Sequence, residues 1–516
     1  MDARRAGWLR EAPFWAVSAV LHLVLFFFLI QIALTAPNTK EPPRLIRVVA
    51  PEAPPQRERS PRRNVSNRLK TFHPEVWDKP IIELEPEVER AIAEGSEAAD
   101  TNVDVTPWSR ADNSLGVGGG GAKRYGDRKG MLVKKGGGGP ESEKAVVAAL
   151  EWLRRHQSSD GSWRAADFVD ECRTTCANTD GKRYGNGRGF SEHDVGVTAL
   201  AMLPFAGYGH THQDGERPEY VEVLRNAVRF MKSVQVESSN PNENGRYGHP
   251  DTPFADLPEQ WIYDHAIATM AMGELLAMSN DVIGLRRSVT NAAKPCLHSQ
   301  NAGYGWKYGI KPGRNDTSVT DWMVLALKTA KNARLDIPQD EYARAFRGAL
   351  AWLDRATSRA TGKTGYEVPG DEGSRLADAY VAPYPYSKDL SCMTAVAVLC
   401  RLFAGTSRSD PMVKRGVDVL MRERPAWSEA EGGKESTVNV YYWYYGSYAL
   451  FQFGGSLWKR WNESMLKALL STQRTSGDED GSWDPIGEWG AAGGRVYSTA
   501  LGAMTLEVYY RYLRTK

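Results

Sequence analysis

The feature that most constrains this chain is a short pattern that occurs twice, at positions far apart in the sequence. In the first copy, an amphipathic stretch ends at Gln157, and a polar turn containing Gly161 leads to Trp163. In the second copy, a similar stretch ends at Gln473 and is followed, after a glycine, by Trp483. The recurrence of helix, glutamine, glycine and tryptophan indicates an internal repeat, and a repeat architecture is therefore our first hypothesis for the fold.

The composition limits the classes of partner. Lys and Arg (65) nearly balance Asp and Glu (63), so the overall charge gives no indication of nucleic-acid binding. The 16 Trp and 22 Tyr favour a large core and an aromatic cavity. Five cysteines are too few for a disulfide scaffold.

Residues 14–34 form an uncharged apolar run that is long enough to cross a bilayer. We expect an uncleaved anchor, with residues 1–36 as cytoplasmic tail and transmembrane segment; the alternative is a signal peptide cleaved near Thr35 and Ala36. The short tail before a single span resembles the start of TonB-like envelope proteins. We therefore expect the rest of the chain on the periplasmic side, although basic residues flank the span almost equally.

The composition changes between residues 37 and 140. Prolines lie among charged residues in the first part, and glycine runs occur at 116–121 and 136–139. Apolar periodicity is confined to residues 81–92. Such a segment cannot bury enough apolar surface to fold, so we expect a disordered linker that holds a domain away from the membrane.

From residue 141 to 516, amphipathic and apolar helical segments alternate. The amphipathic ones are expected at 145–157, 220–234, 285–300, 342–356, 412–422 and 461–473. The apolar ones are expected at 195–205, 265–278, 318–333, 390–403, 438–453 and 496–513. Segments that are apolar all round must be buried inside the amphipathic ones. Six helical hairpins in a closed ring satisfy this requirement, and we predict an all-α, (α/α)6 toroid.

The Gln…Gly…Trp element resembles the QW repeat of the superfamily of squalene–hopene cyclases, oxidosqualene cyclases and protein prenyltransferases. Besides the two good copies, Gln300 with Trp306 is a fair one, and degenerate copies occur at Gln235 with Tyr247, at Gly365-Tyr366 and at Trp427. The resemblance covers residues 141–516 and implies the same α/α toroid. We expect the glutamine amide to bond backbone groups at a helix end and the Trp ring to lie against it, joining outer to inner helix.

The catalytic motifs of that superfamily are largely missing. Its cyclases use an Asp-x-Asp-Asp-Thr motif, for which Arg314-Asn-Asp316-Thr317 is the best match, with one acid instead of three. Its prenyltransferases bind zinc with an Asp-x-Cys pair and a distant His. Here Asp389 and Cys392 are one position too far apart, and no His follows His298. We therefore expect no metal and no cofactor.

The leading functional hypothesis is a membrane-anchored, non-catalytic toroid of the cell envelope that binds a ligand or a partner protein and no nucleic acid. Two alternatives remain. One is an enzyme acting on an isoprenoid or lipid-linked substrate. The other is an (α/α)6 carbohydrate-active hydrolase or lyase. For an enzyme, the candidate catalytic acids are Asp316, Asp194 and Asp264.

Acidic residues precede several predicted inner helices, and two interpretations remain open. They could be N-caps, or they could converge on one mouth of the ring. In the second case an isoprenoid or glycan ligand would bind in a cavity with an aromatic wall; the alternative for the aromatic residues is core packing. The candidate cavity residues are His193, His265, Asp321, Trp261, Tyr263, Trp322, Tyr441, Tyr442, Trp443 and Tyr448.

Two cysteines, Cys172 and Cys176, lie in the expected loop between the first two helices. Outside the cytoplasm they could form a disulfide; free thiols, or a metal site with His193, are the alternatives. The other three cysteines lie in apolar helical patterns and are expected in the core, at Cys296, Cys392 and Cys400.

Overall fold

The computed structural model describes His22 and residues 126–173, 187–252, 256–258, 261–369, 391–428, 436–487 and 489–511. The chain divides into two units, residues 1–68 and 69–516, and every helix discussed below belongs to the second. Apart from His22, the expected span at 14–34 lies outside the described residues, as does most of the linker. Within the described ranges, no helix combines the length and apolar character needed to cross a bilayer.

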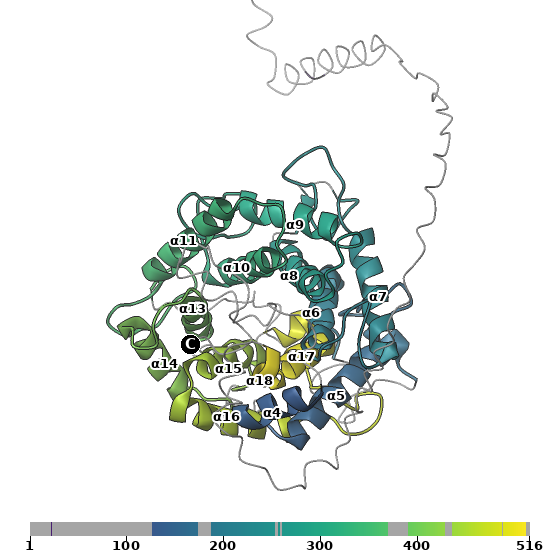
Figure 1. The fold of residues 1–516 in the computed structure, drawn as a ribbon, viewed down its shortest axis with the longest axis vertical. Coiled ribbons are helices and arrows are strands. Elements are labelled where there is room, and N and C mark those ends of the chain that lie inside the picture. The colour runs from purple at the N-terminus through teal and green to yellow at the C-terminus, as the bar shows by residue number, and fades with distance from the viewer. Residues whose placement is uncertain are drawn as a thin grey trace, which may run out of the picture. The chain divides into compact units, whose positions relative to one another are not determined.

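Twelve helices form two concentric layers that close into a ring (Figure 1). The outer layer consists of α5 (Pro140–Arg155), α7 (Pro218–Ser233), α9 (Arg286–His298), α11 (Gln339–Ala356), α14 (Pro411–Arg422) and α16 (Gly455–Leu470). The inner layer consists of α6 (Asp194–Gly207), α8 (Trp261–Ser279), α10 (Thr317–Asn332), α13 (Cys392–Phe403), α15 (Val440–Phe453) and α17 (Gly490–Leu506). All twelve segments were predicted from the sequence, and α17 packs against both α5 and α6 to complete the toroid.

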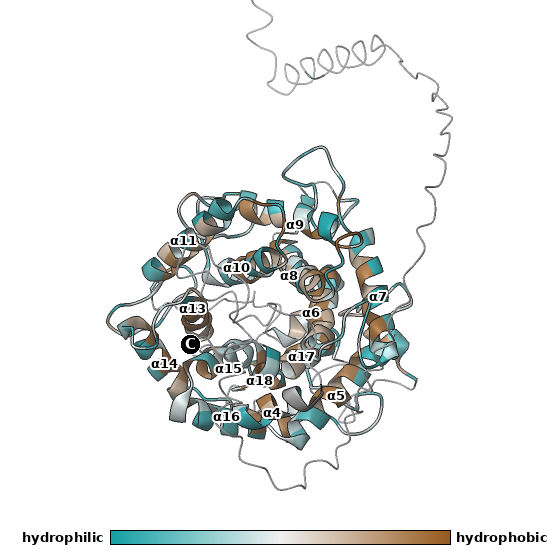
Figure 2. Ribbon diagram, viewed as in Figure 1, coloured by the Kyte–Doolittle hydropathy of each residue, from teal (hydrophilic) through white to brown (hydrophobic). Residues whose placement is uncertain are grey.

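The two layers follow from the pattern of apolar residues. In α7 the buried side chains recur with helical spacing, as at Tyr220, Leu224 and Met231, so that only one stripe faces the interior. In α13 every residue is buried. Figure 2 shows this difference, with polar and apolar colours along α7 and α11 and a mainly apolar α13. The core therefore lies between the layers.

The glutamine of the repeat joins one outer helix to the next. The Gln157 amide nitrogen donates to the carbonyl of Gly161 in its own turn (3.0 Å) and to that of Val223 in α7 (3.0 Å). The same double contact joins α7 to α9 and α9 to α11, from Gln235 and Gln300. We call this two-acceptor contact the glutamine clamp. It links neighbouring outer helices, rather than an outer to an inner helix as we expected.

The ring closes through the same clamp. Gln473, after α16, donates to the carbonyls of Gly481 (2.8 Å) and of Ala145 in α5 (2.8 Å). The Trp152 indole of α5 donates to the carbonyl of Asp478 at 2.9 Å. The last and first repeats therefore meet as any two neighbours do, which confirms the predicted closure.

In the turns that carry Trp163, Trp306 and Trp483, the tryptophan joins the outer helix to the inner one. The Trp163 indole donates to the carbonyl of Leu153 at 2.7 Å, at the end of α5. The Trp163 main-chain nitrogen donates to the Thr198 hydroxyl of α6 at 2.9 Å. Trp306 and Trp483 make the equivalent contacts with Thr320 and Thr499. The tryptophan, and not the glutamine, thus connects the two layers.

The fourth repeat differs from its predicted alignment at Gly365-Tyr366. The left-handed glycine of this turn is Gly362 (φ 78°), and a Cβ there would meet the backbone of α14. Thr364 occupies the tryptophan position, since its main-chain nitrogen donates to Thr394 of α13 at 3.0 Å. Tyr366 therefore takes no part in the contact between the layers, and its hydroxyl instead contacts Asp316.

A helix before the predicted start of the toroid also packs on it. Helix α4 (Gly126–Gly136) contacts the short C-terminal helix α18 (Val508–Arg511). The carbonyls of Gly136 and Gly137 accept hydrogen bonds from Trp458 (2.7 Å) and Asn462 (2.8 Å) of α16. A Cβ at Gly136 would collide with Tyr509. The described part of the toroid thus includes α4, ahead of residue 141, and Gly136 and Gly138 of the glycine run lie close against Tyr509.

Candidate functional site

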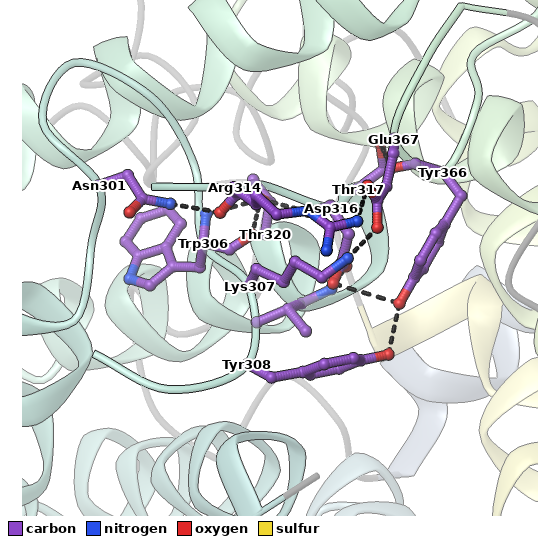
Figure 3. A network of polar contacts seen from close by, with 11 residues as sticks. Asn301, Trp306, Lys307, Tyr308, Arg314, Asp316, Thr317, Thr320, Tyr366 and Glu367 are labelled. Carbon is purple, nitrogen blue, oxygen red and sulfur yellow. Dashed lines mark hydrogen bonds and ion pairs between the residues drawn. The ribbon is translucent and has the colours of Figure 1, made fainter. Parts of the chain in front are cut away.

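The most developed polar cluster among the described residues lies at the N-terminal end of α10 (Figure 3). Asp316 is the N-cap of this helix, and its side chain accepts from the Val319 main chain at 2.7 Å. Its own main-chain nitrogen donates to the carbonyl of Trp306 at 2.8 Å. The repeat turn thus fixes the position of this carboxyl, which is fully buried.

Two tyrosines lie in front of the buried carboxyl. The Tyr366 hydroxyl donates to the second Asp316 carboxyl oxygen at 3.2 Å and is hydrogen-bonded to the Tyr308 hydroxyl. The segment carrying Tyr366 is held by Thr317, whose main-chain nitrogen and hydroxyl donate to carbonyls of residues 365 and 366. Both rings are partly buried, in contrast to the fully buried Asp316.

Charged side chains surround the two tyrosines. Lys307 is paired with Glu367, and Arg314 pairs with the same carboxylate at 2.7 Å. The Lys307 ammonium also lies over the ring of Tyr308 at 5.5 Å and that of Tyr366 at 5.6 Å. The cluster therefore offers donors, acceptors and aromatic faces to a polar ligand.

Burial changes the titration of the central acid. It raises the pKa of Asp316 to about 7, although the Val319 N–H, the Lys307 charge and the Tyr366 hydroxyl each oppose the shift. A carboxyl that titrates near neutrality can both give and accept a proton, which is what acid–base catalysis requires. Asp316 is thus the candidate catalytic acid for which the geometry is most favourable.

The other two candidate acids lie together on α6 and α8. Asp194 accepts from the Ala165 main chain at 2.8 Å, and burial raises its pKa to about 6. Burial raises the pKa of Asp264 well above its usual range, and the Asp194 charge adds to that shift. The N-cap interpretation holds for Asp316, whereas Asp264 lies inside α8. Asp389, the fourth acid in this series, lies outside the described residues.

The two candidate histidines have different surroundings. His265 is fully buried, accepts from the Tyr247 main chain at 3.1 Å and lies 3.4 Å from the Cys296 sulfur. It occupies the position of Thr198 in the first repeat, so it connects layers, and burial lowers its pKa to about 3. His193 lies 4.0 Å from Glu192, and burial lowers its pKa.

Three of the candidate aromatic residues pack into the core, two of them toward the outer layer and one against a neighbouring inner helix. Tyr442 contacts Trp461 of α16, and Trp443 contacts Trp427, so both pack toward the outer layer. The Tyr448 hydroxyl donates to the carbonyl of Met504 in α17 at 2.7 Å. These three side chains therefore support the core interpretation.

The remaining aromatic candidates lie near the polar cluster or beside one another. Tyr263 lies 6.0 Å from Tyr308, and Trp322 lies 6.4 Å from Tyr441, between ring centroids. Trp261, which is buried, lies 6.0 Å from the His265 ring.

Asp321 lies deeper on the inner layer, where three helices meet. Its carboxyl accepts from the Cys400 sulfur of α13 at 3.0 Å. Burial raises the pKa of Asp321 to about 7, although the nearby Tyr445 hydroxyl of α15 and the Cys400 thiol oppose the shift. The structure therefore holds a second buried carboxyl with a near-neutral pKa on the same helix as Asp316.

The cysteines agree with the expectations where they can be compared. Cys172 is disulfide-bonded; Cys176 lies outside the described residues, so the pairing of the two stays a prediction. Cys296, Cys392 and Cys400 are free and buried, as expected for core residues. Among the described residues, no group of three or more His, Cys, Asp or Glu is arranged to hold a metal ion.

Several residues of the cluster were not predicted as site residues from the sequence. Lys307, Tyr308 and Glu367 lie in connections between helices and belong to no recognisable motif. Tyr366 was assigned only to a degenerate repeat. The one sequence signal that led to this place is the Arg314-Asn-Asp316-Thr317 stretch, because it aligns with an acidic motif.

No protein-family model matches the sequence, and no curated protein matches it. Three solved structures are distantly similar, each over 71–72% of this chain at 9–10% identity. An inactive variant of an alpha-1,6-mannanase from Salegentibacter sp. HEL1_6 in complex with alpha-1,6-mannotriose is matched over 99% of its length, with a TM-score of 0.44. A novel alpha-amylase from Clostridium perfringens is matched over 98% (TM-score 0.43). A possible GH105 member from Salmonella enterica serovar Paratyphi A is matched over 93% (TM-score 0.42). Likenesses at this level establish neither a shared family nor a shared activity.

Proposed function

We propose that the toroid is a carbohydrate-active protein that binds a glycan at the cluster in front of Asp316 and cleaves it by acid–base chemistry. The observation that carries this proposal is the Asp316 carboxyl, which is buried and hydrogen-bonded to Tyr366, and whose pKa is raised by burial to about 7. A carboxylic acid that is still protonated near neutrality can protonate a glycosidic oxygen.

The surroundings of Asp316 suit a hydroxyl-rich ligand. Aromatic faces at Tyr308 and Tyr366 can stack on sugar rings, while Lys307, Glu367 and Arg314 supply charged donors and acceptors. An isoprenoid would offer no hydrogen-bonding groups to these side chains and would only remove water from them, which is costly for charged groups. The polar chemistry of the cluster thus favours the carbohydrate alternative over the isoprenoid one.

The second candidate function is the non-catalytic toroid that binds a ligand or partner. It is favoured by one observation, namely that the Asp316 carboxyl caps α10 and so has a structural role in its own right. The two candidates differ in whether Asp316 is needed for turnover or only for folding.

The test uses the full-length chain and a panel of neutral and acidic polysaccharides. New reducing ends and unsaturated sugar products are measured, together with glycan binding. We expect product from at least one glycan, with turnover reduced about 100-fold or more in Asp316→Asn at unchanged fold, as for loss of a general acid. Binding without any product would favour the non-catalytic toroid. If no glycan binds, the proposal is wrong.

A further inference from the structure

The face of the ring at which the inner helices end lies opposite the polar cluster. Arg511 of α18, just after α17, donates to the Leu203 carbonyl near the end of α6 (2.7 Å) and pairs with Glu274 near the end of α8 (2.7 Å). Arg286, which follows the α8–α9 connection, donates to the carbonyl of Arg334, just after α10, at 2.8 Å. Four inner helices thus end on one side of the ring, which we call the rear face, whereas the polar cluster lies at the N-terminal end of α10.

Two adjacent apolar side chains are exposed on the rear face, in the connection between α8 and α9. Ile283 is 98% exposed and Val282 is 48% exposed. Isoleucine is among the residue types most often found fully buried, and no other large apolar side chain among the described residues is as exposed as Ile283. We call this pair the apolar tip. It presents two branched aliphatic groups, side by side, to the surroundings of the ring.

The turn that carries the apolar tip is held in shape by its own polar contacts. One Asp281 carboxyl oxygen accepts from the Gly284 main chain at 2.8 Å, and the other lies 2.8 Å from Nε2 of His212. The Leu285 main-chain nitrogen donates to the Asp281 carbonyl at 3.1 Å. A Cβ at Gly284 would come within 2.1 Å of the carboxylate, so the turn requires glycine there. The exposure of the tip is therefore a consequence of a well-connected turn.

Positive charge lies directly beside the apolar tip. Helix α9 begins with Arg286 and Arg287 and has no acid in its first turn, whereas the first turns of α5, α7 and α11 all carry acids. The N-terminus of a helix has a partial positive charge, so two arginines are unfavourable there unless an anion is close. The Arg287 side chain is 84% exposed, and its acidic neighbour Glu237, at 3.6 Å, is 83% exposed. Water weakens so exposed a pair, and an anionic surface could take its place.

Helix α4 adds a second element of the same kind to the rear face. Its Lys129 ammonium lies 3.1 Å from the centre of the Tyr208 ring, which directly follows α6, so α4 crosses the side on which the inner helices end. Met131 of this helix is 47% exposed, and its last turn carries two exposed lysines. The described part of the toroid begins with α4, and the chain ahead of it contains the apolar run at 14–34.

We propose that the rear face rests on an anionic lipid bilayer, with the apolar tip inserted among the lipids. Aliphatic side chains gain from leaving water, and the adjacent arginines and lysines gain from anionic headgroups. The anchor expected at 14–34 would keep such a bilayer within reach. A stable protein interface buries about 1,200–2,000 Å², which is far more than a two-residue tip offers. The inference is independent of the proposed function, and it turns the polar cluster away from the membrane.

The test probes the surroundings of the tip in the full-length chain, reconstituted in vesicles of phosphatidylcholine alone or mixed equally with phosphatidylglycerol. An environment-sensitive fluorophore is attached to Ile283→Cys, and labelled wild type supplies the background. We expect blue-shifted emission and strong quenching by lipids that carry a nitroxide in the acyl chain, both more pronounced in the anionic mixture. Val368→Cys, at an exposed apolar residue next to the polar cluster, is the matched control and should emit as in water on both vesicles.

A charge reversal tests the contribution of the arginines. Arg287→Glu, added to the labelled Ile283→Cys chain, changes a highly exposed side chain, so the fold should be retained, and circular dichroism checks this. On the anionic vesicles we expect the ratio of inserted to free label to fall about fivefold or more, because a basic residue near an anionic surface is replaced by an acid. On phosphatidylcholine alone we expect little change.

Water-like emission from position 283 on the anionic vesicles would overturn the proposal. So would quenching at position 368 equal to that at position 283, because the rear face would then not be the one in contact with lipid. A label at position 283 that is shielded from water but not quenched by the nitroxide lipids would indicate a protein contact, and it would overturn the proposal as well.

Discussion

The two sides of the ring are built differently. From α16 through α5, α7 and α9 to α11, each outer helix is joined to the next by a glutamine clamp. Among the described residues, the two-acceptor clamp is found at these four junctions. Around α14 there are contacts of both kinds. Between the layers, Arg401 of α13 is 2.5 Å from Asp354 of α11 and Ser391 donates to Glu423 at 2.7 Å; along the outer layer, Arg415 of α14 donates to the carbonyl of Arg359.

This difference teaches what the repeat motif does. The turn glycine approaches the next helix closely with or without a clamp: a Cβ at Gly161 would meet the Asn226 carbonyl at 2.3 Å, and one at Gly362 would meet the backbone of α14. The glutamine then bonds carbonyls that this approach shields from water. Around α14 the contacts of Arg415 and Glu423 stand in the place of a clamp. We therefore expect the clamped arc to be more sensitive to substitution than the α14 arc.

The largest expected contrast concerns tryptophan. Trp163 is fully buried in a clamped turn, whereas Trp427, in the α14 arc, is partly buried. We expect Trp163→Ala to lower the free energy of unfolding by about 3–5 kcal/mol and Trp427→Ala to lower it by clearly less. Denaturant unfolding of both variants measures the contrast. Equal losses would mean that the two arcs are equally dependent on their tryptophans.

The next contrast concerns the clamp that closes the ring. Gln473→Ala removes two hydrogen bonds and leaves their carbonyl acceptors less satisfied, so we expect a loss of about 1–3 kcal/mol in the free energy of unfolding. Gln339→Ala, at an exposed glutamine of α11, is the matched control, with a change within about 0.5 kcal/mol. A loss for Gln473→Ala no larger than for the control would contradict the role of the clamp.

The pH dependence of stability tests the site, which lies where the two arcs meet. The folded-state pKa of Asp316 is about 7 and its ordinary value is 3.8, so between these pH values the folded chain holds a proton that the unfolded chain has lost. Stability from this group is therefore present at low pH and declines as the pH rises toward 7.

Asparagine cannot ionise and avoids this decline. Relative to the wild type, Asp316→Asn should gain up to about 1.4 kcal/mol per pH unit between about pH 4 and 7. Asp340→Asn, at an exposed acid of α11, should run parallel to the wild type. Unfolding midpoints across this pH range supply the measurement. A pH-independent difference for Asp316→Asn would show that its carboxyl titrates normally.

The smallest effect is expected in the rate at which the backbone amides of individual outer helices exchange with solvent. Without a clamp on either side, the amides of α14 should exchange with solvent sooner than those of α7, which is clamped at both junctions. Hydrogen exchange followed by mass spectrometry compares the two helices in one sample. Slower exchange in α14 would indicate that the contacts from the inner layer hold it more firmly than the clamps hold α7.

The helices could be predicted because their signals are local. Amphipathic spacing, as in α7, and uniform apolarity, as in α13, fix which layer each segment joins. The α4 segment was missed because a glycine run is typical of coil; only the close approach of Tyr509 explains why Gly136 lacks a side chain.

Of the residues that form the polar cluster, only Asp316 was proposed as a site residue from the sequence. Asp316 was identified through a motif, but Tyr366, Lys307 and Glu367 come from connections whose positions depend on the finished ring. The hydroxyls of Tyr263, Ser318 and Tyr441 come from three different helices, so no spacing within one segment reveals their contacts. His265 is the opposite case. The sequence suggested a cavity residue there, but the structure gives it the same role as Thr198 in the first repeat, namely to connect the two layers.

The closed ring is the claim on which the site and both arcs depend, and a distance across its seam tests it most directly. Spin labels at Lys144→Cys in α5 and Lys467→Cys in α16, both near the closing clamp, report that distance in the full-length chain. A closed ring predicts a single narrow distribution at the separation of neighbouring helices, whose axes lie about 8–10 Å apart. A broad distribution, or a distance typical of helices at opposite ends of an open array, would contradict the closed toroid.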